Sequence, residues 1–378
     1  MRKTWRPDTA GAALQGVSVT ILDHAEYGTA KTDATGRYNL PVEGGGPLVV
    51  TFTYAGYLSL QRTVQVPWNE ITAVETVALT AQDTASTSIQ FDGDPATIST
   101  HRGTTFQDDN GVRAATVVFT GDTKAYEVDA NGTQGSQLTT LTVRATEYTT
   151  PDSMPAALPA NSAFTYCVEL SVDQAERVQF SKAVAVFVNN FLGFPVGSIV
   201  PVGYYDRDKG VWVPMDNGVV VKLLDADNDG LVDGLDATGD DLADDLDSDG
   251  TTTNEVAGLT DKTVYQPGKT YWRFETTHFS PFDCNWPRKL PDDATGPNPD
   301  GDPRLSPPRC PTGDCPNAAG SQVTSRERVL HQDITIPGTD MTLHYSSSRV
   351  SGYKKVFDIP VSGVTVPSSL QSIIVKVE

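Results

Sequence analysis

Short runs of alternating apolar and polar residues recur along most of the chain. They are rich in Val, Ile, Thr, Tyr and Phe, and Gly, Asp, Asn or Pro residues bound them, which is typical of β-strands. The spacing that would predict amphipathic helices is almost absent. Strands are expected at Val17–Leu22, Pro47–Tyr54, Arg62–Val66, Ala114–Thr120, Leu138–Ala145, Phe164–Ser171, Ala183–Val188 and Val219–Leu224. We therefore predict an all-β protein made of consecutive β-sandwich domains.

Turns and a proline-rich segment divide this pattern into blocks. The first block covers residues 10–82 and the second covers residues 84–286, each a series of short strands. Residues 287–320 hold nine prolines among 34 residues. Because proline lacks the backbone donor that a sheet interior needs, this stretch is expected to be a linker. Residues 321–378 are expected to start a further β-rich region that is truncated at its end.

The first block contains a set of residues at characteristic positions. They are Gly16, Val17 and Val19, then Thr32, Asp33, Gly36 and Tyr38, then Gly56 and Tyr57. On these residues the block resembles the carboxypeptidase regulatory-like domain, a transthyretin-like sandwich of the Ig-like class. Gly36 suits a turn position with positive φ, Asp33 can accept hydrogen bonds from the turn backbone, and Tyr38 can return to the core. The resemblance implies a structural domain and no catalytic activity.

Two later strings give the chain a second resemblance. They are HFSPFDCNWP, residues 278–287, and IPGTDMTLHYSSSRVSGYK, residues 336–354. With the order of the blocks, they resemble the region that precedes the repeats in bacterial Rhs/YD-repeat proteins, which are similar to teneurins. The resemblance implies a secreted or cell-surface polymorphic toxin. This chain would then be a non-catalytic scaffold or binding module, with the YD-repeat shell of the same polypeptide as its partner.

The charge of the chain narrows the range of partners. Asp and Glu exceed Lys and Arg by 48 to 28, which gives a formal charge of −20. A nucleic-acid binder needs a basic surface, so nucleic acid is excluded as a partner, and binding to anionic membranes is disfavoured. No apolar run approaches the length of a transmembrane helix, so no membrane insertion is expected. An adhesin that binds a cell-surface protein, or a glycan through the first sandwich, is an alternative. Separately, aromatic residues such as Trp68, Tyr204 and Tyr205 are candidates for binding sugars, with packing in the core or in cross-strand pairs as the alternative.

An acidic segment at residues 225–250 gives the clearest sign of chemistry. The string DADNDGLVDGLD, residues 225–236, fits the spacing of a calcium-binding EF-hand loop, with Gly230 at the sharp turn. The oxygens at positions 1, 3, 5, 7, 9 and 12 would come from Asp225, Asp227, Asp229, Leu231, Asp233 and Asp236. Because no helices are expected to flank it, this would be a helix-less calcium loop. The alternative is a solvated acidic loop that holds no metal.

A second copy of the motif follows at DLDSDG, residues 245–250. Asp245, Asp247 and Asp249 precede Gly250 with the same spacing. Positions 9 and 12 fall on Thr253 and Val256, while Glu255 lies one place early. Calcium is thus the expected cofactor, with ligation less complete in the second loop.

The tripeptide His278-Phe279-Ser280 suggests a second kind of chemistry. In some β-domains such a sequence cleaves itself: the serine hydroxyl attacks the preceding carbonyl, with the histidine as general base. Here the cut would fall between Phe279 and Ser280. Pro281 follows directly and restricts Ser280, which counts against the reaction. A strand whose Phe279 packs inward is the alternative, and a single full-length species by denaturing mass spectrometry would exclude cleavage.

Four cysteines are spread over the chain at positions 167, 284, 310 and 315. They allow two disulfides with three connectivities. A local Cys310–Cys315 bond and a Cys167–Cys284 bond are candidates, and four free thiols are the alternative.

Overall fold

The computed structural model describes residues 12–69, 71–159 and 162–286, and four strands between residues 322 and 360. The chain divides into two units, residues 1–288 and 289–378. All regular elements of the described residues are β-strands, apart from three short 3-10 helices. These helices are η1 (Ala25–Tyr27), η2 (Pro151–Ser153) and η3 (Asn254–Val256). The predicted all-β class with consecutive sandwich domains is confirmed.

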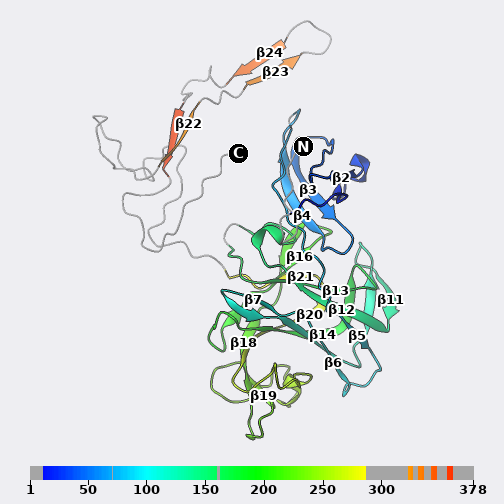
Figure 1. The fold of residues 1–378 in the computed structure, drawn as a ribbon, viewed down its shortest axis with the longest axis vertical. Coiled ribbons are helices and arrows are strands. Elements are labelled where there is room, and N and C mark those ends of the chain that lie inside the picture. The colour runs from blue at the N-terminus through cyan, green and yellow to red at the C-terminus, as the bar shows by residue number, and fades with distance from the viewer. Residues whose placement is uncertain are drawn as a thin grey trace, which may run out of the picture. The chain divides into compact units, whose positions relative to one another are not determined.

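The N-terminal domain is built on a four-stranded antiparallel sheet in the order β2-β1-β3-β4. Figure 1 draws this domain in blue, with β2, β3 and β4 labelled. Its strands are β1 (Ser18–Ile21), β2 (Ala30–Lys31), β3 (Gly46–Thr53) and β4 (Leu60–Val66). Alternate residues of the first strand region, Val17, Val19 and Ile21, are at most 4% exposed. This period of two places one face of β1 in the core of the domain.

The turn after β2 behaves as the sequence predicts. The Asp33 carboxylate accepts hydrogen bonds from the backbone N–H groups of Thr35 (2.7 Å) and Arg37 (3.1 Å). Gly36 has a φ of 73°, a conformation that a residue with a Cβ rarely adopts. Tyr38 then enters the core and is 5% exposed. The roles expected for Asp33, Gly36 and Tyr38 are confirmed.

The second block forms two larger antiparallel sheets that share one core. The first has six strands in the order β17-β16-β21-β13-β12-β5. The second has nine strands, with β14 at its branch point: one path runs β11-β10-β14-β20-β18-β15, β9 and then β6 also join β14, and β19 joins β18. Val168 and Leu170 of the six-stranded sheet meet Trp272 and Phe274 of the nine-stranded sheet in that core. The two sheets therefore form a β-sandwich.

The strands of these sheets have the following bounds. In the six-stranded sheet they are β5 (Thr87–Gln90), β12 (Thr140–Glu147), β13 (Cys167–Val172), β16 (Gly203–Asp206), β17 (Val211–Pro214) and β21 (Pro281–Asp283). In the nine-stranded sheet they are β6 (Ile98–Arg102), β9 (Ala115–Thr120), β10 (Ala125–Val128), β11 (Gln134–Leu138), β14 (Val178–Asn189), β15 (Ile199–Val200), β18 (Gly218–Leu224), β19 (Gly234–Asp236) and β20 (Thr270–His278). A separate hairpin pairs β7 (Phe106–Asp108) with β8 (Gly111–Arg113).

The second unit contributes two strand pairs. They are β22 (Gln322–Arg326) with β25 (Val356–Pro360), and β23 (His331–Thr335) with β24 (Thr342–Ser346). The predicted linker at 287–320, with Cys310 and Cys315, lies outside the described residues.

An ion pair between a partly exposed arginine and a buried carboxylate lies where the N-terminal domain meets the six-stranded sheet. Arg207, in the β16–β17 turn, donates to both carboxylate oxygens of Glu169 at 2.7 Å. The same guanidinium reaches the Ser59 carbonyl of the N-terminal domain at 3.2 Å. Tyr148 donates to Glu169 at 2.7 Å, and Glu169 is only 6% exposed. We call this contact, including Gln61 and Arg62, the junction.

Two residues of β4 complete the junction from the side of the N-terminal domain. Gln61 accepts a hydrogen bond from the Tyr205 hydroxyl (2.7 Å) and donates to the Arg207 carbonyl (3.0 Å). Arg62, 4% exposed, donates to the carbonyls of Met154 (3.1 Å) and Asp152 (2.8 Å). Because buried polar groups need partners, these bonds fix how the two domains sit against each other. Tyr205 is buried here at 2% exposure, so it is not the exposed sugar-binding residue that the sequence suggested.

Cys167 and Cys284 are both buried and both free. Cys167 pairs in register with Asp283, the neighbour of Cys284. Since successive side chains of a strand point to opposite faces, the two thiols lie on opposite sides of the sheet. Cys284 belongs to the sandwich core, and Cys167 to a separate cluster with Leu58 and Tyr148. The candidate Cys167–Cys284 disulfide is therefore corrected to two free thiols.

Candidate metal centre

The acidic segment forms three consecutive loops after strand β18. We name them loop A (residues 225–233), loop B (residues 236–244) and loop C (residues 245–255). Strand β19 separates loops A and B and pairs with β18, with Asp236 opposite Lys222. The pairing of β19 with β18 therefore fixes the position of the chain between loops A and B.

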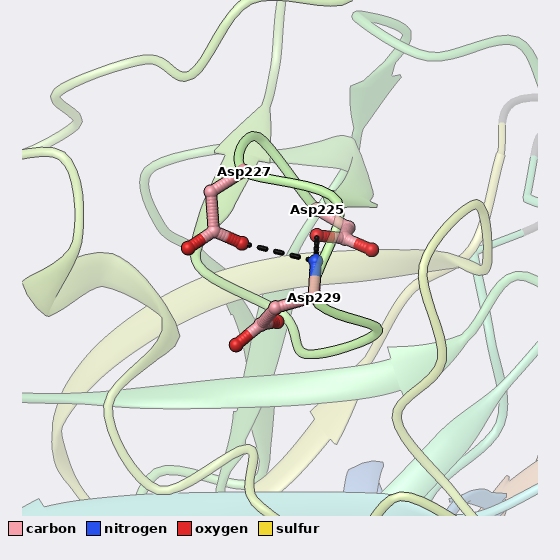
Figure 2. Close-up of side chains that lie close together, drawn as sticks. All are labelled: Asp225, Asp227 and Asp229. Atoms are coloured by element: carbon pink, nitrogen blue, oxygen red, sulfur yellow. Dashed lines mark hydrogen bonds between the residues drawn. The ribbon is translucent and has the colours of Figure 1, made fainter.

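Loop A brings three carboxylates close together, and two of them accept hydrogen bonds from one backbone amide (Figure 2). The N–H of Asp229 donates to Asp225 (3.0 Å) and Asp227 (3.1 Å). The N–H of Gly230 donates to the second oxygen of Asp225 at 2.9 Å. Oxygens of Asp225, Asp227 and Asp229 lie within 4.8 Å of one another. These three expected ligands are therefore brought together.

The other residues expected to ligate in the first loop have different positions. Asp233 accepts the N–H of Ala226 at 2.8 Å and closes the loop. Asp236 is 1% exposed and ends β19, where pairing with β18 draws it away from loop A. Leu231 is 38% exposed. Neither Asp233 nor Asp236 belongs to the carboxylate cluster, and the ligand role of the Leu231 carbonyl stays a prediction.

Loop C has a similar cluster with a different third member. Oxygens of Asp245, Asp247 and Glu255 lie within 4.8 Å of one another. Glu255 is 8% exposed and sits in η3, which turns its side chain toward the loop. Asp249, the residue expected from the sequence, instead accepts a hydrogen bond from Asn254 at 2.9 Å. One oxygen of Asp245 is buried and has no hydrogen-bond partner.

Loop B has the shape of its neighbours, but a lysine side chain lies against one of its carboxylates. Asp236 accepts the N–H of Asp241 at 3.1 Å, and Asp244 accepts the N–H of Ala237 at 2.7 Å. The Lys222 ammonium of β18 forms an ion pair with Asp241. A side chain of the protein thus supplies positive charge to loop B.

The three loops repeat one backbone conformation. The fourth residue of each has positive φ: Asn228 at 63°, Gly239 at 87° and Ser248 at 63°. The sixth residue does too: Gly230 at 83°, Asp241 at 63° and Gly250 at 91°. The sequence pattern did not indicate loop B, because Thr238 stands at its third position, where loops A and C have aspartate. Loop B also has glycine at its fourth position (Gly239) and aspartate at its sixth (Asp241), whereas loops A and C have glycine at the sixth. The spacing of Asp236, Asp240 and Asp244 was the available signal.

A hydrophobic cluster attaches the loops to the outer face of the nine-stranded sheet. Leu235, Val256 and Tyr265 pack against Phe187 and Tyr271. A buried ion pair of 3.1 Å also joins Arg273 of β20 to Glu255. Burial raises the pKa of the Glu255 carboxyl, although Arg273 opposes the shift. A structural change in the loops would therefore alter the packing and the ion pair that join them to the nine-stranded sheet.

The clusters offer only carboxylate oxygens. Hard cations such as Ca²⁺ prefer oxygen ligands, whereas Zn²⁺ sites use nitrogen and sulfur. Ca²⁺ takes six to eight oxygens, so the three carboxylates of each cluster would need carbonyl groups and water to complete its shell. The donor set of loops A and C fits calcium.

The residues of the predicted self-cleavage site lie at the crossing from β20 to β21. Phe279 is 7% exposed and packs against Phe180, with ring centroids 4.9 Å apart. The Ser280 carbonyl accepts the N–H of Leu170 at 3.2 Å. Within this described segment no hydrogen bond joins His278 to Ser280. Phe279 packs inward, as expected for the alternative of an ordinary strand. Self-cleavage between Phe279 and Ser280 stays a prediction.

Known proteins match the N-terminal domain. A family model described as the Teneurin TTR-like domain matches residues 7–79. Mouse teneurin-1 is 36% identical over 69 residues, mouse teneurin-3 is 30% identical over 83 residues, and human teneurin-1 is 33% identical over 69 residues. These stretches cover 18%, 22% and 18% of this chain and only 2%, 3% and 2% of the relatives.

The fold and the match together define the class of this domain. It is a transthyretin-like β-domain, so that part of the sequence prediction is confirmed. Its similarity is to the version found in teneurins. Among the described residues, no helix is long and apolar enough to cross a membrane.

Proposed function

We propose that this chain is a non-catalytic, calcium-stabilised scaffold or binding module of a large exported protein of the Rhs/YD-repeat kind. The observation that carries the calcium part is the pair of three-carboxylate clusters in loops A and C. Without a cation these carboxylates repel one another, and a bound Ca²⁺ would offset that repulsion. Because the loops pack on the nine-stranded sheet, ion binding would stabilise the sandwich itself.

The larger assembly is proposed on the teneurin-like domain and the later sequence strings. The TTR-like match supports membership in a large multidomain protein. The strings at 278–287 and 336–354 support a downstream YD-repeat shell in the same polypeptide. A reading frame that continues without YD repeats would contradict this part. Secretion or display on a bacterial surface is proposed on the same ground.

Calcium is expected to raise the melting temperature of the chain. After treatment with a chelator, about 1 mM Ca²⁺ acting on a site with a Kd of about 10 μM adds about 2.7 kcal/mol of stability. For a unit of this size the shift is about 5–10 °C. The measurement is a thermal melt of the full chain with chelator, Ca²⁺ or Mg²⁺.

Matched variants connect the shift to the loops. Asp227→Asn and Asp247→Asn each remove one cluster carboxylate and should reduce the calcium shift. Asp129→Asn is the control, because Asp129 caps a hairpin turn by accepting the N–H groups of Asn131 and Thr133 but lies outside both clusters. A calcium shift that is absent, or equal in all three variants, would leave loops A and C as solvated acidic loops.

A further inference from the structure

The hairpin that joins β10 to β11 turns at the sequence DANGT, residues 129–133. Within it, Asn131-Gly132-Thr133 has the form Asn-x-Ser/Thr, the acceptor sequence for an N-linked oligosaccharide in exported proteins. No other asparagine of the sequence is followed by Ser or Thr at the second position. The turn takes no part in the calcium loops or the junction, so it is free for another role.

Hydrogen bonds within the turn place Asn131 at the tip of the hairpin. The Asp129 carboxylate accepts the backbone N–H groups of Asn131 (2.9 Å) and Thr133 (2.8 Å). The Gly132 N–H donates to the Asp129 carbonyl at 3.0 Å, and Gly132 has a φ of 79°. Asn131, Gly132 and Thr133 are all exposed. Within the described part of the chain, the Asn131 side chain makes no hydrogen bond, so its amide is available to an enzyme.

The space around this turn is open. A Cβ atom added to Gly132 would meet no heavy atom within 4 Å. The β7–β8 hairpin offers a comparison, because it also turns at an Asn-Gly pair, Asn110 and Gly111. There, a Cβ atom added to Gly111 would lie 3.2 Å from Phe191. The β10–β11 turn therefore stands clear of the rest of the protein and has room for a bulky group.

The strand after the turn has an open edge. In the nine-stranded sheet, β11 is the last strand and pairs only with β10. It contains no charged residue and no proline, and its first four residues are exposed. Such an edge can pair with a strand of another chain, which natural proteins usually prevent with charges, proline or a cover. The edge strand β17 of the other sheet, by contrast, ends in Pro214. Asn131 precedes β11 by three residues, so a group attached to it would lie beside this edge.

We propose that Asn131 is an N-glycosylation site and that its oligosaccharide shields the open edge of β11. In the transfer, the amide nitrogen of Asn131 forms a bond to the anomeric carbon of an oligosaccharide carried on a polyprenyl diphosphate. The bond from that carbon to the carrier oxygen breaks, the amide loses a proton, and the polyprenyl diphosphate leaves. Thr133 supplies the hydroxyl that the acceptor sequence requires. The proposal rests on the proposed export, because the chain must reach the transferase outside the cytoplasm.

Peptide mapping by mass spectrometry tests the site. The full chain is exported behind an added signal sequence, in cultured animal cells and in a bacterium whose periplasm contains an oligosaccharyltransferase. The peptide with Asn131 should gain the mass of an oligosaccharide, keep it in Thr133→Ser, and lose it in Thr133→Ala and Asn131→Gln. Asn110→Gln, in the other Asn-Gly hairpin turn, should not change it.

The added signal separates this proposal from the proposed export. It brings the chain to the transferase whether or not the natural protein is exported, so the result reports on the site alone. The location of the protein in its own cells tests export. An exported chain in which Asn131 is unmodified in both hosts would overturn the proposal.

Sedimentation velocity tests the shielding of β11. The glycosylated chain should stay monomeric, whereas Asn131→Gln should shift toward dimers as its concentration rises. Adding Ser136→Lys to Asn131→Gln should restore the monomer, because a lysine on an edge strand opposes pairing with another strand. A monomeric Asn131→Gln chain at every concentration, or dimers that persist in the double variant, would overturn the shielding role.

Discussion

Replacing Arg207 with methionine is expected to lower the free energy of unfolding by about 3–5 kcal/mol, because it leaves a buried carboxylate without its counter-charge. Both oxygens of Glu169 accept hydrogen bonds from Arg207, and Glu169 is 6% exposed. The variant also removes the bond to the Ser59 carbonyl, which connects the two domains. Urea denaturation of wild type and variant measures the difference.

A double variant shows whether the buried charge causes this loss. Arg207→Met combined with Glu169→Leu removes both charges, and an apolar pair in place of a buried ion pair is often close to neutral. It should regain most of the stability that the single variant loses. Arg37→Met is the control, since Arg37 is exposed and should change stability by at most about 0.5 kcal/mol. A loss below about 1 kcal/mol in Arg207→Met would show that the junction contributes little.

Trp272→Ala is expected to cost a similar amount, about 3–5 kcal/mol, for a different reason. Trp272 is 0% exposed at the centre of the sandwich core. Its ring lies 4.9 Å from Trp286 and 5.0 Å from Phe191, centroid to centroid. Truncation removes these contacts and leaves a cavity that the two sheets can only partly close. Chemical denaturation measures the loss.

Graded substitutions separate packing from hydrogen bonding at this site. Trp272→Phe keeps an aromatic ring but loses the bond from the indole N–H to Asn190, which is 2.8 Å long. It should cost less than the alanine variant. Trp68→Ala, at a residue 66% exposed, should have a small effect. Equal losses at Trp68 and Trp272 would contradict the assignment of the core.

The strands were the most predictable part of the fold, because their signal is local. Val17, Val19 and Ile21 alternate with polar residues, and each is buried. All eight ranges expected from the sequence overlap observed strands. The turn at Asp33 and Gly36 was also predictable, since Asx hydrogen bonds and positive φ leave a recognisable residue pattern.

Contacts between distant residues were not predictable in this way. Arg207 and Gln61 come from different domains, and nothing in either local pattern indicates that they meet. In the acidic segment, the register of β19 decides where Asp236 points, and η3 decides that Glu255 joins Asp245. Both outcomes depend on packing against β18 and β20. The spacing of the aspartates in the sequence does not predict that packing.

The two free thiols affect how the protein can be handled. Cys167 and Cys284 lie on opposite faces of one sheet and are buried. Burial raises the pKa of both thiols, which keeps them in the unreactive protonated form. Residues 12–286 therefore need no oxidising folding partner. Reducing expression hosts and reducing buffers are compatible with this part of the chain, and its native packing protects both sulfurs from alkylating reagents.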